Sequence, residues 1–209
     1  MKIGIIGAGF VGRSIAKLAL QAGHDVMLSN SRGPQTLFSL RPMIGCQIGS
    51  ANDAAEFGEV VVIAVPLSAV NALPVAGINN KHVIDAVNYY PERDGEISRL
   101  DAGQTTTSEL LAHILPAARV TKAFNAIPMT QLESDGLPAG AENRRALPLA
   151  GDDEEGKNIA AALYEAFGFD AVDAGPLSEG WRFERGRPAY CVRMTRQELL
   201  TTLAQTTRG

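Results

Sequence analysis

Hydrophobic and polar positions alternate along the chain in two kinds of block, short apolar runs and longer amphipathic stretches. The apolar runs predict buried strands, and the amphipathic stretches predict helices that cover a core. Strands are predicted over residues 2–6, 25–29, 46–49, 59–65, 82–86, 119–123, 146–150 and 170–173. Helices are predicted over residues 10–21, 34–41, 52–57, 68–73, 107–115, 155–167 and 196–205. Because strands alternate with helices, we expect an α/β protein with a Rossmann-type, doubly wound parallel sheet.

The regular order weakens after residue 124, although a further strand–helix–strand unit follows. We therefore expect a Rossmann domain over residues 1–145 and a small C-terminal α/β extension over residues 146–209 that packs on it. Residues 88–104 show neither the helical nor the strand period. They predict a long and partly mobile loop.

A glycine-rich turn follows the first predicted strand and opens the first predicted helix. Its six residues are Gly7, Ala8, Gly9, Phe10, Val11 and Gly12. This spacing lets the chain turn sharply, lets the backbone approach a pyrophosphate and lets the helix pack close to the strand. The amides at the start of the helix face the phosphates, with the positive end of the helix dipole behind them. The sequence therefore predicts that these residues bind a dinucleotide.

The residues after the second predicted strand indicate which dinucleotide binds. NAD-binding proteins usually place Asp or Glu there, where the carboxylate holds the ribose 2′-hydroxyl. This chain has Asn30, Ser31 and Arg32 instead, with no acidic residue in reach. A hydroxyl-rich turn with an arginine suits a 2′-phosphate, so we predict NADP(H) as the cofactor. The alternative for Arg32 is a solvated charge on a loop.

Ala64, Val65 and Pro66 stand at the end of the fourth predicted strand. Ligands of doubly wound sheets bind at the carboxyl ends of the strands. We therefore expect this turn to follow the ribose and nicotinamide side of the dinucleotide. The alternative is that Pro66 only begins a helix.

The next two strands end in segments that contain amide side chains. Asn88 follows the fifth strand, where it can bond the nicotinamide carboxamide or an acceptor ring, and the tyrosines after it are equally suited to packing. Asn125, Ile127 and Pro128 follow the sixth strand. This mixture of apolar residues with one amide suits a planar ring laid against nicotinamide, so we predict an acceptor pocket there. The alternative is a plain exit from the strand.

Composition and charge narrow the classes of partner. The net charge of −4, without a basic stripe, argues against nucleic acid, and no apolar run reaches the ~18–20 residues of a membrane span. Cys46 and Cys191 form no metal or redox motif, and the chain starts directly with a strand, so we expect a cytoplasmic protein without a signal peptide. His24, His82 and His113 stand singly, which favours core or surface roles over catalysis or metal binding.

Acid–base candidates are therefore scarce in this sequence. Hydride transfer between two planar rings needs stacked rings, a dry pocket and a near-attack distance rather than a proton shuttle. Alcohol oxidation, in contrast, usually needs a base. We expect the chain to pass a hydride from NADPH to a small-molecule redox acceptor.

The chain resembles the NADPH-dependent reductases of the deazaflavin coenzyme F420, a family related to the oxidoreductase domain of the STEAP metalloreductases. The resemblance covers nearly the whole chain and rests on residues 5–12, 29–32, 123–128, 149–153 and 173–177. It implies a Rossmann domain with a small C-terminal part and hydride transfer between NADP and the deazaflavin. By position, it implies that Ser31 and Arg32 hold the 2′-phosphate and that the segment around Ile127 lines the deazaflavin pocket.

One segment departs from the deazaflavin reductases. They carry His-x-Ile-Pro where this chain has Asn125-Ala126-Ile127-Pro128, and the STEAP-like proteins carry Phe-Asn-Thr there. The second substrate thus stays open between coenzyme F420 and a flavin such as FMN or FAD. Two other functions also stay open, an NADP(H)-binding regulatory module without turnover and a small imine or carbonyl reductase. The resemblance and the C-terminal helix suggest a homodimer, and Trp181 is placed either over the site or in a dimer contact.

Overall fold

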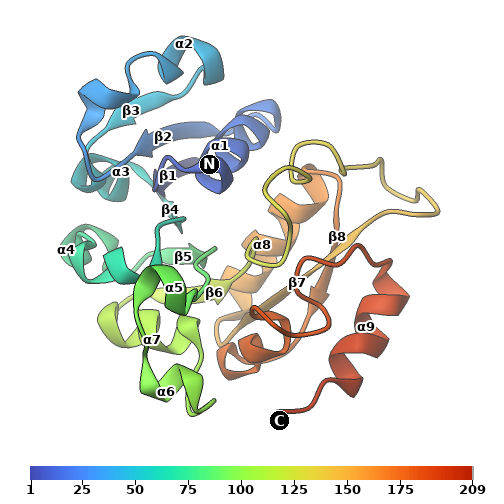
Figure 1. The fold of residues 1–209 in the computed structure, drawn as a ribbon. Helices are drawn as coiled ribbons and strands as arrows, with labels where there is room; N and C mark the ends of the chain where they lie inside the picture. Colours follow the sequence, from blue (N-terminus) through green and yellow to red (C-terminus); the bar gives the residue numbers. More distant parts are fainter. Residues whose placement is uncertain (209) are drawn as a thin grey trace.

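The computed structural model describes residues 1–208, which form an eight-stranded sheet in the order β3-β2-β1-β4-β5-β6-β7-β8 (Figure 1). The strands are β1 (Lys2–Ile6), β2 (Asp25–Ser29), β3 (Gln47–Gly49), β4 (Val60–Ile63), β5 (His82–Asp85), β6 (Arg119–Lys122), β7 (Ala146–Gly151) and β8 (Asp170–Asp173). The first six strands run parallel to one another. The α/β class and the Rossmann-type sheet are therefore confirmed.

The expectation of a wholly parallel sheet is wrong at one pair. Strand β7 runs antiparallel to β6, and β8 is then parallel to β7. A parallel connection needs a crossover, which is usually a helix. The chain between β6 and β7 forms turns and loops without a helix, so it enters the sheet from the opposite end. Helix α8 (Glu154–Ala166) then supplies the crossover that makes β8 parallel to β7.

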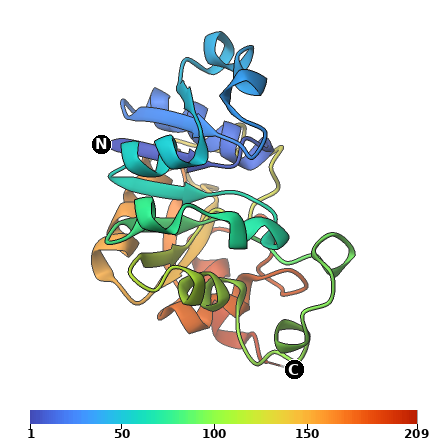
Figure 2. The same ribbon diagram turned by 90° about the vertical axis from the view of Figure 1, so that its left-hand side faces the viewer.

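Helices cover both faces of the sheet (Figures 1 and 2). Besides α8, they are α1 (Phe10–Gln21), α2 (Leu40–Ile44), α3 (Ala51–Phe57), α4 (Val75–Ile78), α5 (Pro91–Asp94), α6 (Ser98–Asp101), α7 (Thr107–Ile114) and α9 (Arg196–Gln205), with 3₁₀ helices η1 (Pro34–Leu37), η2 (Leu67–Ala72) and η3 (Leu177–Phe183). Helices α1 and α8 share one core, and α3, α4 and α7 share a second on the other face. Helix α9 closes a third core over β7 and β8. No helix within residues 1–208 has the length and apolar character to cross a bilayer.

Several local predictions need correction. Residues 88–104, expected to be a loop, contain α5 and α6. Both short helices are held by side chains: Asp94 accepts hydrogen bonds from the backbone amides of Ser68 and Tyr90, and the Tyr89 hydroxyl donates to Asp101. The helix predicted over residues 34–41 is split into η1 and α2, that over residues 68–73 is the 3₁₀ helix η2, and the fourth strand ends at Ile63. Helices α4 and η3 were not predicted.

The strand order reverses between β1 and β4, because the chain adds β2 and β3 on one side and β5 and β6 on the other. The carboxyl ends of the strands at such a point form a crevice where ligands bind. The C-terminal extension continues the same sheet through β7 and β8, and the boundary at residue 145 stays a prediction. The last described residues lie beside the α6 region, where Arg208 donates to the Gly103 carbonyl at 3.5 Å (Figure 2).

Candidate functional site

At two of its three glycine positions, the glycine turn has a geometry that only glycine can adopt. Gly7 has a φ of +118°, and a Cβ there would lie 2.2 Å from the carbonyl oxygen of Ala64. A Cβ at Gly12 would lie 1.9 Å from the carbonyl oxygen of Gly7, so α1 can pack against β1 only without a side chain. At Gly9 a Cβ would meet nothing within 4 Å. The space in front of Gly9 is thus open for a ligand that approaches the backbone.

Within residues 1–208, no side chain compensates the partial positive charge at the N-terminus of α1. Gly9 is the N-cap, no side chain caps the helix, and its first turn contains no acidic residue. The first amides of a helix have no intrahelical acceptor, and the helix dipole adds a partial positive charge there. A pyrophosphate can satisfy these amides.

A first hollow of about 410 Å³ lies along the glycine turn and the end of β2. Its lining residues are Ile6, Gly7, Ala8, Gly9, Arg13, Asn30, Ser31, Arg32, Ala51, Ala64, Val65, Pro66, Ala69, Ala72 and Leu73. The lining contains two arginines and no carboxylate. The predicted residues Asn30, Ser31 and Arg32 therefore line the same hollow as the glycine turn, and Arg13 is an additional charged lining residue that was not predicted.

The turn that carries Arg32 is fixed by its neighbours. The Asn30 side chain accepts a hydrogen bond from the Arg32 amide at 3.1 Å and donates to Thr36 at 2.9 Å. Gln35 donates to the Arg32 carbonyl at 3.2 Å. Among the ion pairs formed within residues 1–208, none involves the Arg32 guanidinium. These hydrogen bonds fix the backbone of the turn, and the charge of the Arg32 guanidinium stays available to a ligand.

A second hollow of about 510 Å³ continues from the first. The two share Gly9, Ala64, Val65 and Pro66. The other lining residues are Phe10, Val11, Ala86, Asn88, Tyr90, Arg93, Phe124, Asn125, Ile127, Pro128, Met129, Thr130, Tyr190 and Cys191. Asn88, Asn125, Ile127 and Pro128 thus lie in one hollow, and Gly12 alone of the predicted residues lines neither hollow. Their roles in binding stay predictions.

Asn88 and Asn125 hold each other at the ends of β5 and β6. The Asn88 side chain donates to the Asn125 carbonyl at 3.0 Å, and the Asn125 amide donates to Asn88 Oδ1 at 3.3 Å and to the Phe183 carbonyl at 3.0 Å. The Asn125 side-chain oxygen is buried and accepts no hydrogen bond from residues 1–208. A buried acceptor without a partner is costly unless a ligand or water satisfies it.

The backbone at Phe124, where the chain leaves β6, is held in a strained conformation by the C-terminal extension. Phe124 has a φ of +63°, which non-glycine residues seldom adopt. Its amide donates to the Tyr164 hydroxyl at 2.7 Å, and the two rings meet edge to face with centroids 4.5 Å apart. Tyr164 in turn donates to the Pro148 carbonyl, and complete burial raises the pKa of its hydroxyl. Residues of β7 and α8 therefore set the direction in which the chain leaves β6.

Among the lining residues of the second hollow that were not predicted, four carry a phenol, guanidinium or thiol group. Tyr90 and Arg93 come from the region expected to be a loop, and Tyr190 and Cys191 come from the C-terminal extension. The hydroxyl oxygens of the two tyrosines are 2.5 Å apart. The pair Tyr90–Tyr190 spans 100 residues of chain, and no local pattern marks residue 190, so the sequence held no signal for this contact.

A buried charged cluster lies behind the second hollow. Lys122 and Asp85 are both fully buried, with the ammonium nitrogen 3.7 Å from the carboxylate and 3.7 Å from Glu184. Lys122 donates to Thr107 at 2.7 Å and to the Val87 carbonyl at 3.2 Å. The cluster thereby ties the ends of β5 and β6 to α7 and η3.

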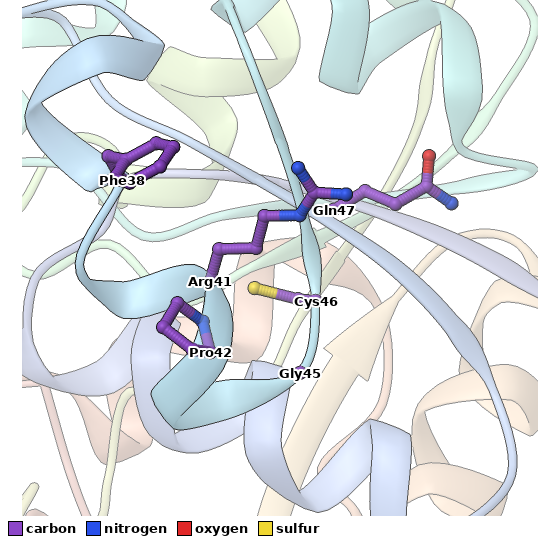
Figure 3. A pocket seen from close by; sticks show the side chains of 6 residues that line it. All are labelled: Phe38, Arg41, Pro42, Gly45, Cys46 and Gln47. Atoms are coloured by element: carbon purple, nitrogen blue, oxygen red, sulfur yellow. The ribbon is translucent and has the colours of Figure 1, made fainter.

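Other features lie apart from the two hollows. None of the three histidines lines either hollow of residues 1–208. Trp181 is 7% exposed and lies beneath the guanidinium groups of Arg182, Arg187 and Arg208, so it does not pack over the site. A third hollow at the sheet edge shares no residue with the other two, and Figure 3 shows the Arg41 side chain extended across it between Phe38 and Gln47. Within residues 1–208 no cluster of three or more His, Cys, Asp or Glu side chains is placed to hold a metal ion.

Together the sheet, the open glycine turn and the arginine-bearing turn after β2 form a Rossmann-type fold with a candidate dinucleotide-binding site. Residues 2–89 match the model of the family described as NADP oxidoreductase, coenzyme F420-dependent. The chain is also 29% identical over 185 residues to the rat (Rattus norvegicus) metalloreductase STEAP3, a match that covers 88% of this chain and 36% of the rat protein. It therefore spans only a minor part of the length of this relative.

Solved structures show the same fold. A hypothetical protein from Sinorhizobium meliloti has a TM-score of 0.80 and 29% identity, with 94% of this chain and 95% of that chain covered. A proposed F420-dependent NADP reductase from an Arthrobacter species has a TM-score of 0.73 and 25% identity, with 86% of this chain and 87% of that chain covered. An imine reductase from Bacillus cereus has a TM-score of 0.62 and 15% identity, with 85% of this chain and 55% of that chain covered. At this identity the likeness shows the fold alone.

Proposed function

We propose that this protein transfers a hydride from NADPH to a planar acceptor, either the deazaflavin coenzyme F420 or a flavin such as FMN or FAD. One observation carries the proposal: a hollow with two arginines and no carboxylate opens directly into a second hollow lined by apolar residues and amides. The first suits the additional phosphate of NADPH, and the second suits a ring that must lie against the nicotinamide.

The residues of the first hollow fit NADPH. The uncapped amides of α1 and the open space at Gly9 suit the pyrophosphate. Arg32, which forms no ion pair within residues 1–208, suits the 2′-phosphate, because a guanidinium forms charge-assisted hydrogen bonds with phosphate oxygens. Bound there, NADPH supplies the hydride, and the shared residues Ala64, Val65 and Pro66 direct its nicotinamide toward the second hollow.

The residues of the second hollow fit a planar ring system. Ile127 and Pro128 present apolar surface, and Phe10 is 70% exposed at its edge. The unpartnered Asn125 oxygen can accept a hydrogen bond from a carboxamide or ring N–H. The family match and the name of the Arthrobacter relative support a deazaflavin as the acceptor.

Stopped-flow absorbance of NADPH oxidation tests the proposal. The purified protein is mixed with NADPH and then with coenzyme F420, FMN, FAD or a ferric chelate. We expect rapid oxidation with the deazaflavin or a flavin, and slower oxidation when NADH replaces NADPH. Tight binding of NADPH without turnover of any acceptor would indicate a regulatory module instead. Turnover restricted to cyclic imines or small carbonyl compounds would indicate the alternative reductase.

A further inference from the structure

The second hollow contains a pair of phenols that the hydride transfer itself does not use. Tyr90 and Tyr190 both line the hollow, and their hydroxyl oxygens lie 2.5 Å apart. Two hydroxyls in contact share one hydrogen bond, so one proton of the pair remains free for another acceptor.

The surroundings indicate which proton is free. The Arg93 and Arg185 guanidinium groups lie over the Tyr90 ring at 4.8 and 4.7 Å from its centroid, and Arg185 is itself paired with Glu92. Both guanidinium groups therefore lie against the Tyr90 ring, and Arg93 is likewise paired with a carboxylate, that of Asp94. Burial, together with hydrogen bonding to Tyr90, raises the pKa of Tyr190, so Tyr190 keeps its proton and donates it toward Tyr90. The proton of Tyr90 is then the one directed elsewhere.

We infer that Tyr90 is the proton donor of the acceptor pocket and that Tyr190 positions and recharges it. The inference rests on the proposed function and specifies the class of acceptor: one that takes up a proton on nitrogen or oxygen along with the hydride. A C–H bond of the dihydronicotinamide breaks, and its electron pair forms a C–H bond on the acceptor. The Tyr90 O–H bond breaks, and its proton forms an N–H or O–H bond on the acceptor. NADPH is oxidised by two electrons and the acceptor is reduced by two.

The cycle closes through the phenol pair. The Tyr90 oxygen takes the proton that Tyr190 donates, and Tyr190 takes one from water. The charged and titratable groups that face this pair are Arg93 and Asp94 of α5, Glu92, Arg185 and Cys191. Because proton transfer in the transition state typically contributes 10²–10⁴-fold, loss of the Tyr90 hydroxyl has a large effect on turnover.

The substitutions Tyr90→Phe and Tyr190→Phe test the inference, with Tyr89→Phe as the matched control. Tyr89 is the neighbouring tyrosine, and it bonds Asp101 without lining the hollow. With the acceptor that the wild type reduces, we expect kcat to fall about 100-fold or more in Tyr90→Phe. We expect a smaller fall and an altered pH profile in Tyr190→Phe, and no change in Tyr89→Phe. The deuterium oxide solvent isotope effect on kcat should be present in the wild type and altered in Tyr90→Phe.

Two measurements without turnover separate this role from a structural one. The Kd of NADPH and the melting temperature of Tyr90→Phe should match the wild type. The absorption band of the bound oxidised acceptor should shift, because the ring loses one hydrogen bond. A Tyr90→Phe variant that reduces the acceptor at the wild-type rate would overturn the inference and leave the proposed function intact. A wild type that reduces none of the acceptors would overturn both.

Discussion

The two hollows meet at the same edge of the sheet but are assembled in different ways. The first is built mainly from residues close in sequence, the glycine turn and the turn after β2. The second combines residues from α5, from the exit of β6 and from the C-terminal extension. A site made of local turns can be recognised in a sequence, because its geometry is set by spacing. A site made of distant segments depends on packing, which spacing does not reveal.

The two hollows also differ in how they are supported. Short backbone and side-chain contacts within residues 29–36 fix the first, and they leave the Arg32 charge exposed. The second is supported from behind by a fully buried ion pair and by the Tyr164 hydroxyl. Substitutions behind the second hollow should therefore lower the free energy of unfolding, whereas substitutions of Arg32 or Gly9 in the first hollow should change ligand binding alone.

The largest effect is expected from Lys122→Met, which removes the positive charge beside the fully buried Asp85. Methionine is similar in length, so the change leaves an unpaired buried carboxylate rather than a cavity. Breaking such a pair costs about 3–5 kcal/mol. Urea unfolding should show this loss, and the double variant Asp85→Asn with Lys122→Met should recover part of it. A stability equal to that of the wild type would show that the second hollow does not depend on this support.

A smaller and more selective effect is expected from Arg32→Ala. Loss of a charge-assisted hydrogen bond to the 2′-phosphate should weaken the binding of NADPH by about 1.5–3 kcal/mol. The affinity for NADH and the melting temperature should stay unchanged. The matched control is Arg41→Ala, because Arg41 lines the separate hollow of Figure 3. Calorimetric titration with both dinucleotides measures the difference. Equal losses for NADPH and NADH would contradict the assignment of Arg32.

The same contrast explains how far the sequence could predict the structure. The strand–helix order and the turn at residues 7–12 follow from local rules, and the structure places Asn30, Ser31 and Arg32 beside that turn as expected. The ends of β5 and β6 were also identified, because ligands of parallel sheets gather at the carboxyl ends of strands. The roles of these residues in binding stay predictions.

What could not be predicted depends on contacts between distant segments. The reversal at β7 follows from a connection without a helix, and the sequence alone showed only a weakened pattern there. Helices α5 and α6 are single turns stabilised by Asp94 and Tyr89, too short to give a period. The contact of Tyr90 with Tyr190 needs the complete fold.

The stability of the protein at acid pH tests how Asp94 holds the segment that carries Tyr90 and Arg93. Burial opposes ionisation of Asp94, but hydrogen bonds from Arg93 and from the Tyr90 and Ser68 amides outweigh it and lower the pKa to about 2 from 3.8. The folded-state pKa is depressed, so the stabilisation is complete above the unfolded value and is lost as the pH falls toward 2. Asp94→Asn should cost about 2 kcal/mol near pH 6, and the difference from the wild type should shrink below pH 4. Urea unfolding at several pH values measures it, and a difference independent of pH would contradict this role.

The smallest effect is expected from Gly9→Ala. This substitution tests whether the backbone of the glycine turn binds the phosphates of the dinucleotide. A Cβ at this position meets nothing within 4 Å and the backbone has φ −73°, so Gly9→Ala should fold with an unchanged melting temperature. The methyl group would occupy the space through which a pyrophosphate approaches. We therefore expect the binding of NADPH and of NADH to weaken alike, by roughly 1 kcal/mol. Gly12→Ala is the matched comparison, because its Cβ would meet the Gly7 carbonyl and should lower stability as well as binding. Unchanged affinity of Gly9→Ala for both dinucleotides would show that the phosphates do not lie against this turn.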